Sequence, residues 1–193
     1  MGSVRLPAFA AALLVATTAL SSCGQTDGAS DATDSATRSN HAVVLVSGLA
    51  TQTPFTTTTD ACTTGLSAGN SVSALRDRLI AAGNQVYTAP AQAGPGEVPS
   101  TEGLGASSNC PPPLPADLTI DTTADLDVGG AHLAAFVDYL RMKYGITAVD
   151  FVGHSMGGLY ARAAIGNVDW QAGDVAATSL TTLSTPWTGT FPA

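Results

Sequence analysis

The sequence predicts an α/β fold in which helices pack against a mostly parallel β-sheet. Four short runs rich in β-branched residues alternate along the chain with segments of helical periodicity. Parallel strands need long crossover connections, which are usually helices, so this alternation favours a parallel sheet over hairpins. The four predicted strands are 42–46, 85–88, 148–152 and 178–184.

The first helix is expected between the first two predicted strands. Asn70 or Ser71 can cap its start, and Gly83 follows its last apolar residue as a helix end. The apolar residues between them fall at helical spacing: Val72, Leu75 and Leu79.

A long segment at 91–124 is rich in proline and glycine and shows no periodicity, so it is expected to be a loop. It leaves the carboxyl end of a parallel strand, the edge where open α/β sheets bind ligands. We interpret it as a wall or lid of a substrate cleft, with a surface loop of no function as the alternative.

The second helix is predicted to precede the third strand. Thr122, with Asp125 three residues later, makes a start similar to a capping box, and Gly145 ends the helix. One apolar face is expected to pack on the sheet: Leu126, Leu133, Val137, Leu140 and Tyr144. A third helical run, at 159–165, separates the third strand from the fourth.

The motif G-x-S-x-G lies between the third strand and the helical run that follows it, with Ser155 at its centre. This context is typical of a nucleophile elbow, in which the chain turns sharply from strand to helix and exposes the serine hydroxyl. Gly153 and Gly157 are expected where the turn leaves no room for a Cβ atom. Gly158 is expected to let the helix lie close to the sheet.

Residues 153–159 and Arg162 resemble the elbow of the α/β-hydrolase superfamily, and especially of its bacterial lipases and esterases. Two flanking segments agree with this resemblance. Residues 43–49 resemble the strand and loop that supply the oxyanion hole, although Ser47-Gly48 replaces the frequent His-Gly. Residues 180–189 resemble the strand after the elbow helix, with its Thr-Pro-x-x-Gly exit.

The resemblance implies the roles of three residues. Ser155 would be the nucleophile that accepts the acyl group, and the backbone N–H groups of Leu49 and Met156 would form the oxyanion hole. Arg162 itself is expected to be a helix residue that pairs with a nearby acid, with a substrate ligand as the alternative.

The same resemblance implies a general-base histidine, held by an acidic residue, after the serine in chain order. No histidine follows Ser155, and each of the three in the chain has an ordinary surface or half-buried interpretation: His41, His132 and His154. The family's acid and base follow two further strands. We therefore expect residues 41–193 to be the N-terminal part of a longer hydrolase, a partial α/β-hydrolase fold lacking the C-terminal strands.

The N-terminal segment has the pattern of an export signal. Arg5 precedes an apolar stretch too short to span a bilayer, and residues 20–23 resemble a bacterial lipobox. Residues 1–22 are thus predicted to be a lipoprotein signal peptide. Cys23 would be lipidated and hold the protein at a membrane surface of the cell envelope, with free secretion as the alternative. Residues 23–40 are small and polar, as in a flexible tether.

The other two cysteines, Cys62 and Cys110, are expected to form one disulfide in an exported protein, with two unrelated thiols as the alternative. The net charge of −8 and the low charged fraction of 11% argue against nucleic-acid binding. The scattered histidines and the lack of Cys-x-x-Cys predict no metal site, and nothing implies a cofactor.

The sequence thus predicts a carboxylic-ester hydrolase, a lipase or esterase, that acts on a small-molecule or lipid ester through an acyl-serine intermediate at Ser155. This chain alone is expected to be inactive, because its triad acid and histidine are missing. The alternative is a non-catalytic surface lipoprotein that keeps the hydrolase fold as a binding module.

Overall fold

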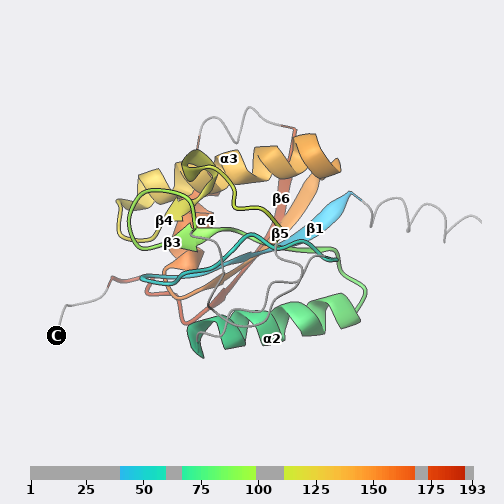
Figure 1. Cartoon of the computed structure of the whole chain (residues 1–193), viewed down its shortest axis with the longest axis horizontal. Coiled ribbons are helices and arrows are strands. Elements are labelled where there is room, and N and C mark those ends of the chain that lie inside the picture. Colours follow the sequence, from blue (N-terminus) through green and yellow to red (C-terminus); the bar gives the residue numbers. More distant parts are fainter. Residues whose placement is uncertain (1–39, 60–66, 99–110, 168–173, 190–193) are drawn as a thin grey trace, which may run out of the picture.

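The structure, a computed structural model, describes residues 40–59, 67–98, 111–167 and 174–189. Helices flank a parallel four-stranded sheet, so the predicted α/β class is confirmed, and the arrangement is consistent with a partial α/β-hydrolase fold (Figure 1). The strand order is β2-β1-β5-β6. The strands are β1 (His41–Val46), β2 (Val86–Thr88), β5 (Ala148–His154) and β6 (Ala176–Leu183).

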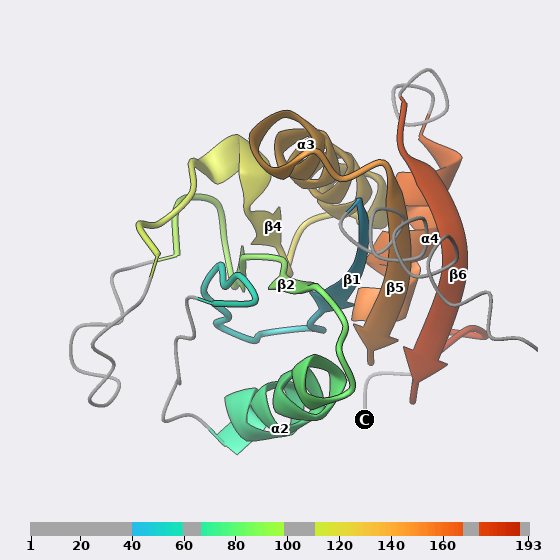
Figure 2. The same ribbon diagram turned by 90° about the vertical axis from the view of Figure 1, so that its right-hand side faces the viewer.

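The helices cover both faces of this sheet. Helix α2 (Ser67–Ala81) lies on one side, and α3 (Leu126–Tyr144) and α4 (Gly157–Gly166) lie on the other (Figure 2). Side chains of β1 alternate between the two cores: Val44 packs with α3 and α4, and Val43 packs with α2. Burial on both faces explains why β1 is a continuous apolar run.

A second, two-stranded sheet lies within the segment that the sequence predicts to be a loop. Strand β3 (Ala91–Gln92) pairs in parallel with β4 (Ile120–Asp121), which follows the 3₁₀ helix η1 (Ala116–Leu118). The prediction of an irregular segment is therefore wrong at both ends of 91–124. Strands of two residues are too short to leave a periodic pattern. Residues 99–110 lie outside the described residues.

Both predicted helix starts differ from the structure, whereas both predicted ends are confirmed. Helix α2 begins at Ser67, before the expected caps Asn70 and Ser71. The N-cap of α3 is Asp125, because the Thr122 hydroxyl is bonded elsewhere. Gly83 and Gly145 follow their helices with φ of +85° and +70°, in the left-handed conformation that glycine favours.

The buried face of α3 is shifted from the predicted one. Leu133, Val137 and Leu140 are buried as expected, but Leu126 is exposed because it lies at the first helical position. Phe136, absent from the predicted face, is fully buried and meets Phe55 edge to face with ring centroids 5.7 Å apart. Aromatic contacts from another segment thus widen the face.

Strand β6 lies at the edge of the four-stranded sheet, and most of its side chains are exposed. It carries no charged residue and no proline. In the described part of the chain no strand pairs with its outer side, so its outward backbone groups are open to pairing.

Several predictions fall outside the described residues: the signal peptide, the tether, Cys23, and the proposed Cys62–Cys110 disulfide. Among the described helices, none has both the length and the apolar character that crossing a bilayer requires.

Candidate active site

Ser155 occupies a sharp turn between β5 and α4, with φ of +53°. Few residues other than glycine adopt this left-handed conformation, which persists only where neighbouring structure holds it. Here the Ser155 N–H donates to the Leu183 carbonyl oxygen at 2.8 Å, and the Thr185 hydroxyl donates to the Ser155 carbonyl oxygen at 2.9 Å. The edge strand and the segment after it therefore hold the turn from behind.

The predicted elbow glycines lie where the backbone segments approach most closely. A Cβ atom on Gly157 would overlap the carbonyl oxygen of Val46, and one on Gly153 would overlap the backbone of Gly158. A Cβ atom on Gly158 would collide with the Thr185 hydroxyl. The absence of side chains at these positions lets α4 start directly over the end of β1.

The loop after β1 lies against the elbow. A Cβ atom on Gly48 would be only 2.7 Å from the Ser155 Cβ, so the two backbones are in close contact. Side-chain hydroxyls fix this loop: Thr51 Oγ1 donates to the Gly48 carbonyl oxygen at 2.6 Å, and Thr53 Oγ1 donates to Ser47 Oγ at 2.9 Å. The loop is therefore held in one shape beside the serine.

Three non-glycine residues of the described chain have positive φ, and all three belong to segments around the elbow. They are Ala50 at +54°, Ser155 at +53° and Ser184 at +55°. Backbone strain of this kind costs about 1–3 kcal/mol per residue and gathers at functional sites. The strain independently marks this edge of the sheet as the candidate site.

Hydrogen-bond donors at the elbow have no acceptor among the described residues. The Ser155 hydroxyl forms no hydrogen bond there, and neither does the backbone N–H of Leu49 or of Met156. Met156 is also the N-cap of α4, whose dipole favours negative charge at this end. In such an arrangement the hydroxyl can attack a carbonyl carbon, and the unpaired N–H groups can donate hydrogen bonds to the oxyanion that forms.

Residues 117–192 match the family model described as "Putative serine esterase (DUF676)". The matched segment contains α3, β5, the elbow, α4 and β6, and it does not include the loop after β1. No curated protein matches the chain. The family match supports a hydrolase or esterase kind of activity.

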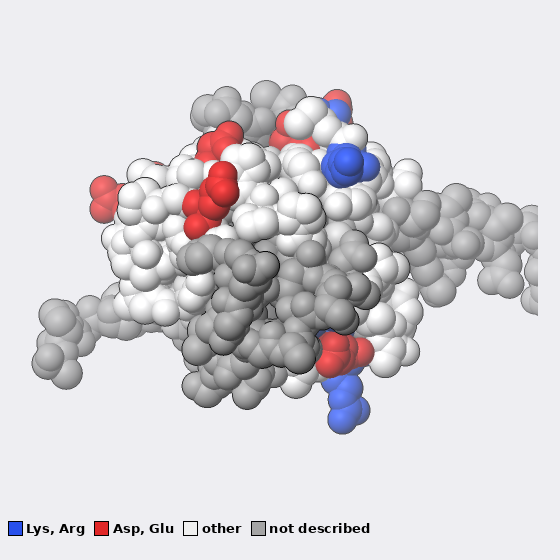
Figure 3. Space-filling model, in the orientation of Figure 1, with Lys and Arg blue, Asp and Glu red and all other residues white. Residues whose placement is uncertain are grey.

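Three exposed apolar side chains lie on segments that contact the elbow. Leu49, Leu183 and Trp187 are 54%, 42% and 49% exposed, and each belongs to a segment that contacts the Ser155 turn. Charged groups are few and scattered on the face in Figure 3. The guanidinium of Arg162 lies 6.0 Å from the centroid of the Trp187 ring. Within the described residues Arg162 thus lies over an aromatic ring. Its ion pair with a nearby acid stays a prediction, because Asp169 lies outside the described residues.

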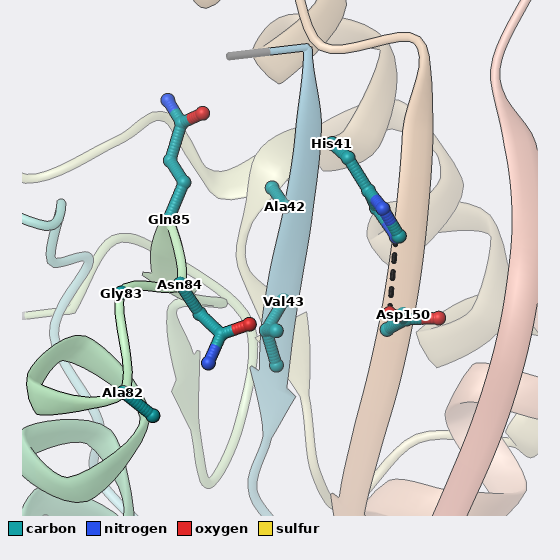
Figure 4. A pocket seen from close by; sticks show the side chains of 8 residues that line it. All are labelled: His41, Ala42, Val43, Ala82, Gly83, Asn84, Gln85 and Asp150. Atoms are coloured by element: carbon teal, nitrogen blue, oxygen red, sulfur yellow. Dashed lines mark ion pairs between the residues drawn. The ribbon is translucent and has the colours of Figure 1, made fainter. Parts of the chain in front are cut away.

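Two of the three histidines are bonded to groups away from the serine. His41 begins β1 at the opposite end of the sheet, where its Nε2 lies 3.0 Å from Asp150 Oδ2 (Figure 4). The two side chains contribute to a pocket of about 190 Å³. His132 Nδ1 lies 2.8 Å from the Thr119 carbonyl oxygen, and His154 is exposed on the elbow itself. None of these histidines is hydrogen-bonded to the Ser155 hydroxyl.

The cluster around Asp150 was not anticipated from the sequence, because its members come from three strands. The Thr178 and Ser179 hydroxyls donate to Asp150 Oδ1 at 2.7 and 2.6 Å. Burial alone would raise the pKa of Asp150, but these hydroxyls and the His41 imidazole outweigh it and hold the pKa below its usual value. The charged carboxylate thus ties β1, β5 and β6 together.

We expect the Asp150→Asn substitution to lower the free energy of unfolding by about 1 kcal/mol at pH 7. The carboxylate has a lower pKa in the folded state than when unfolded, so its stabilisation is present above the unfolded pKa of about 3.9. It is lost as the pH falls through the folded pKa, so the difference between variant and wild type should be smaller at pH 3 than at pH 7. Urea unfolding at both pH values measures this difference.

The matched control is Asp117→Asn, because Asp117 is exposed and its carboxylate has no hydrogen bond within the described residues. Its unfolding free energy should stay within about 0.5 kcal/mol of wild type at both pH values. An equal effect of the two substitutions would contradict a stabilising role for the Asp150 cluster.

Proposed function

We propose that this chain supplies the nucleophile and the oxyanion hole of a serine hydrolase that cleaves carboxylic esters. The observation that carries the proposal is the left-handed turn at Ser155, with an unbonded hydroxyl close to the unpaired N–H of Met156 and the loop of Leu49. The serine-esterase family match over 117–192 supports the same reaction.

In the proposed reaction, Ser155 Oγ attacks the ester carbonyl carbon while its proton passes to a base. The negative oxygen of the tetrahedral intermediate accepts hydrogen bonds from the Met156 and Leu49 N–H groups, each contributing about 3 kcal/mol. Collapse of the intermediate expels the alcohol and leaves acyl-Ser155, which water then hydrolyses. Among the described residues, His41 and His132 are bonded to other groups, so the proposal assigns the role of base to neither of them.

The substrate class that fits best is an ester with an apolar acyl group, as in a lipase or esterase. Apolar side chains around a catalytic group bind the hydrocarbon part of a ligand, while a few polar groups orient its reacting atoms. Leu49, Leu183 and Trp187 are suited to the first role. Export and anchoring through Cys23 stay predictions, and they would bring such a site to a membrane surface.

A fluorophosphonate probe tests this proposal on the 193-residue chain. We expect slow labelling at Ser155 and none in Ser155→Ala. Ser155 Oγ forms a bond to phosphorus, fluoride leaves, and the serine proton passes to water or buffer while the oxyanion hole stabilises the charged oxygen. Peptide mass mapping identifies the labelled residue. Labelling that persists in Ser155→Ala would reject the proposed nucleophile.

Turnover should behave differently from labelling. Because no histidine of the described residues is hydrogen-bonded to Ser155, we expect hydrolysis of short p-nitrophenyl esters by this chain to stay at the Ser155→Ala background. The release of p-nitrophenol, followed by absorbance, measures it. Turnover well above that background would mean that a residue of this chain acts as the base.

The second candidate function is a non-catalytic binding module. It is favoured by the contacts of His41 with Asp150 and of His132 with Thr119, which occupy both histidines away from the serine. The probe separates the two functions: a folded, homogeneous sample that is never labelled at Ser155 would support the binding module and reject the hydrolase.

A further inference from the structure

Thr122 is a fully buried residue whose hydroxyl links the small sheet to the loop beside the elbow. Its Oγ1 accepts the Ala50 N–H at 3.1 Å and donates to the Gln92 carbonyl oxygen at 2.9 Å. Both bonds of the hydroxyl are therefore directed to backbone groups that are distant in the sequence. This geometry makes Thr122 a fixed anchor for residue 50.

The anchor is itself held in place from two sides. The Thr122 N–H donates to the Gln92 carbonyl oxygen at 2.8 Å, and the Tyr160 hydroxyl donates to the Thr122 carbonyl oxygen at 2.9 Å. Tyr160 is fully buried and lies on α4, one turn after the elbow. Burial raises the pKa of Tyr160 to about 12, which keeps its hydroxyl a hydrogen-bond donor at physiological pH.

Hydrogen bonds from two different threonines fix two consecutive peptide units of the loop. In the unit joining Gly48 to Leu49, the carbonyl oxygen is held by Thr51 Oγ1, and a planar trans peptide directs its N–H to the opposite side. In the next unit, the Ala50 N–H is held by Thr122. Leu49 thus keeps an unpaired N–H between two anchored groups, and Ala50 keeps its unfavourable φ of +54°.

We propose that Thr122 is a positioning residue for the oxyanion hole, in which its buried hydroxyl holds Ala50 so that the Leu49 N–H stays directed at the oxyanion. The inference rests on the proposed function, because an oxyanion forms only if Ser155 attacks a substrate. Thr122 forms no hydrogen bond with Ser155 among the described residues, and its hydroxyl acts on the site through the bond to Ala50.

The test compares Thr122→Val, which removes the hydroxyl at nearly constant volume, with Thr122→Ser, which keeps it. We expect Thr122→Val to lower the maximal rate of phosphonylation by tenfold or more, since removing one oxyanion donor costs about 10²–10³ in rate. The concentration of probe giving half-maximal rate should change less than about twofold. Thr122→Ser should restore the rate to within about twofold of wild type.

Thr119→Val is the matched control. Thr119 is also buried, and its hydroxyl also bonds to backbone carbonyl oxygens, those of Leu114 and Pro115, but it has no contact with the loop. The Thr119→Val protein should have a lower free energy of unfolding than wild type but the same labelling rate. Equal labelling rates in folded Thr122→Val and wild type, or an equal loss in Thr119→Val, would overturn the positioning role.

Hydrogen exchange of the Ala50 amide, measured by NMR on the full chain, gives a readout that does not depend on labelling. We expect protection in wild type and Thr122→Ser, and exchange at least about tenfold faster in Thr122→Val. An unprotected Ala50 amide in wild type overturns the inference even if no variant folds. If wild type is protected but never labelled, the proposed function fails and the loop anchor stands without a catalytic role.

Discussion

Replacing Gly157 by alanine is expected to destabilise the fold by about 3 kcal/mol or more and to abolish labelling of Ser155. The added Cβ atom would overlap the carbonyl oxygen of Val46, which is backbone and cannot rotate away as a side chain would. Either α4 shifts off the end of β1 or the turn at the serine opens, at a cost at the upper end of the range for overpacking. Urea unfolding and the phosphonylation rate measure the two effects.

Gly166→Ala is the matched control for this prediction. Gly166 ends the same helix, and a Cβ atom there would meet nothing within 4 Å. Alanine loses less conformational entropy than glycine on folding, so this variant should be equal to wild type or more stable by up to about 1 kcal/mol. A Gly157→Ala protein with wild-type stability and labelling would show that β1 and α4 are not in contact as described.

Replacing Phe136 by alanine is expected to lower the free energy of unfolding by about 3–5 kcal/mol. The side chain is fully buried on α3, and its ring meets those of Phe55 and Tyr139 with centroids 5.7 and 6.4 Å away. Truncation removes these contacts and leaves a cavity that the surrounding sheet and helix cannot fill. Denaturant unfolding followed by circular dichroism measures the loss.

Met142→Ala provides the comparison on the same helix, because Met142 is 67% exposed. Its unfolding free energy should change by less than about 0.5 kcal/mol. If Phe136→Ala costs no more than Met142→Ala, then α3 does not pack on the sheet through the face seen here.

The strands and the elbow could be predicted because their signals are local. A buried parallel strand such as β1 is a continuous apolar run, and the turn at Ser155 needs its glycines within five residues of sequence. The left-handed caps at Gly83 and Gly145 are equally local, since they follow from the conformational freedom of single residues.

The remaining features depend on partners that are far away in the chain. The Thr122 hydroxyl could cap a helix or join two loops, and only the positions of Ala50 and Gln92 decide between these uses. The stacking of Arg162 on Trp187 likewise needs the fold to bring α4 to the segment after β6. Sequence patterns carry no information on such pairs, which explains why the predicted cap at Thr122 was wrong and the contact of Arg162 with Trp187 was not predicted.

The border position of β6 has a consequence for the serine. Within the described residues no strand pairs with the outer side of β6. Leu183 of β6 and Thr185, two residues later, supply two of the hydrogen bonds that hold the turn at Ser155. Fraying of β6 would therefore weaken the hydrogen bonds that hold the Ser155 turn. A segment that paired with the outer side of β6 would strengthen them without touching the serine. An edge strand of the sheet thus helps to fix how the Ser155 hydroxyl is presented.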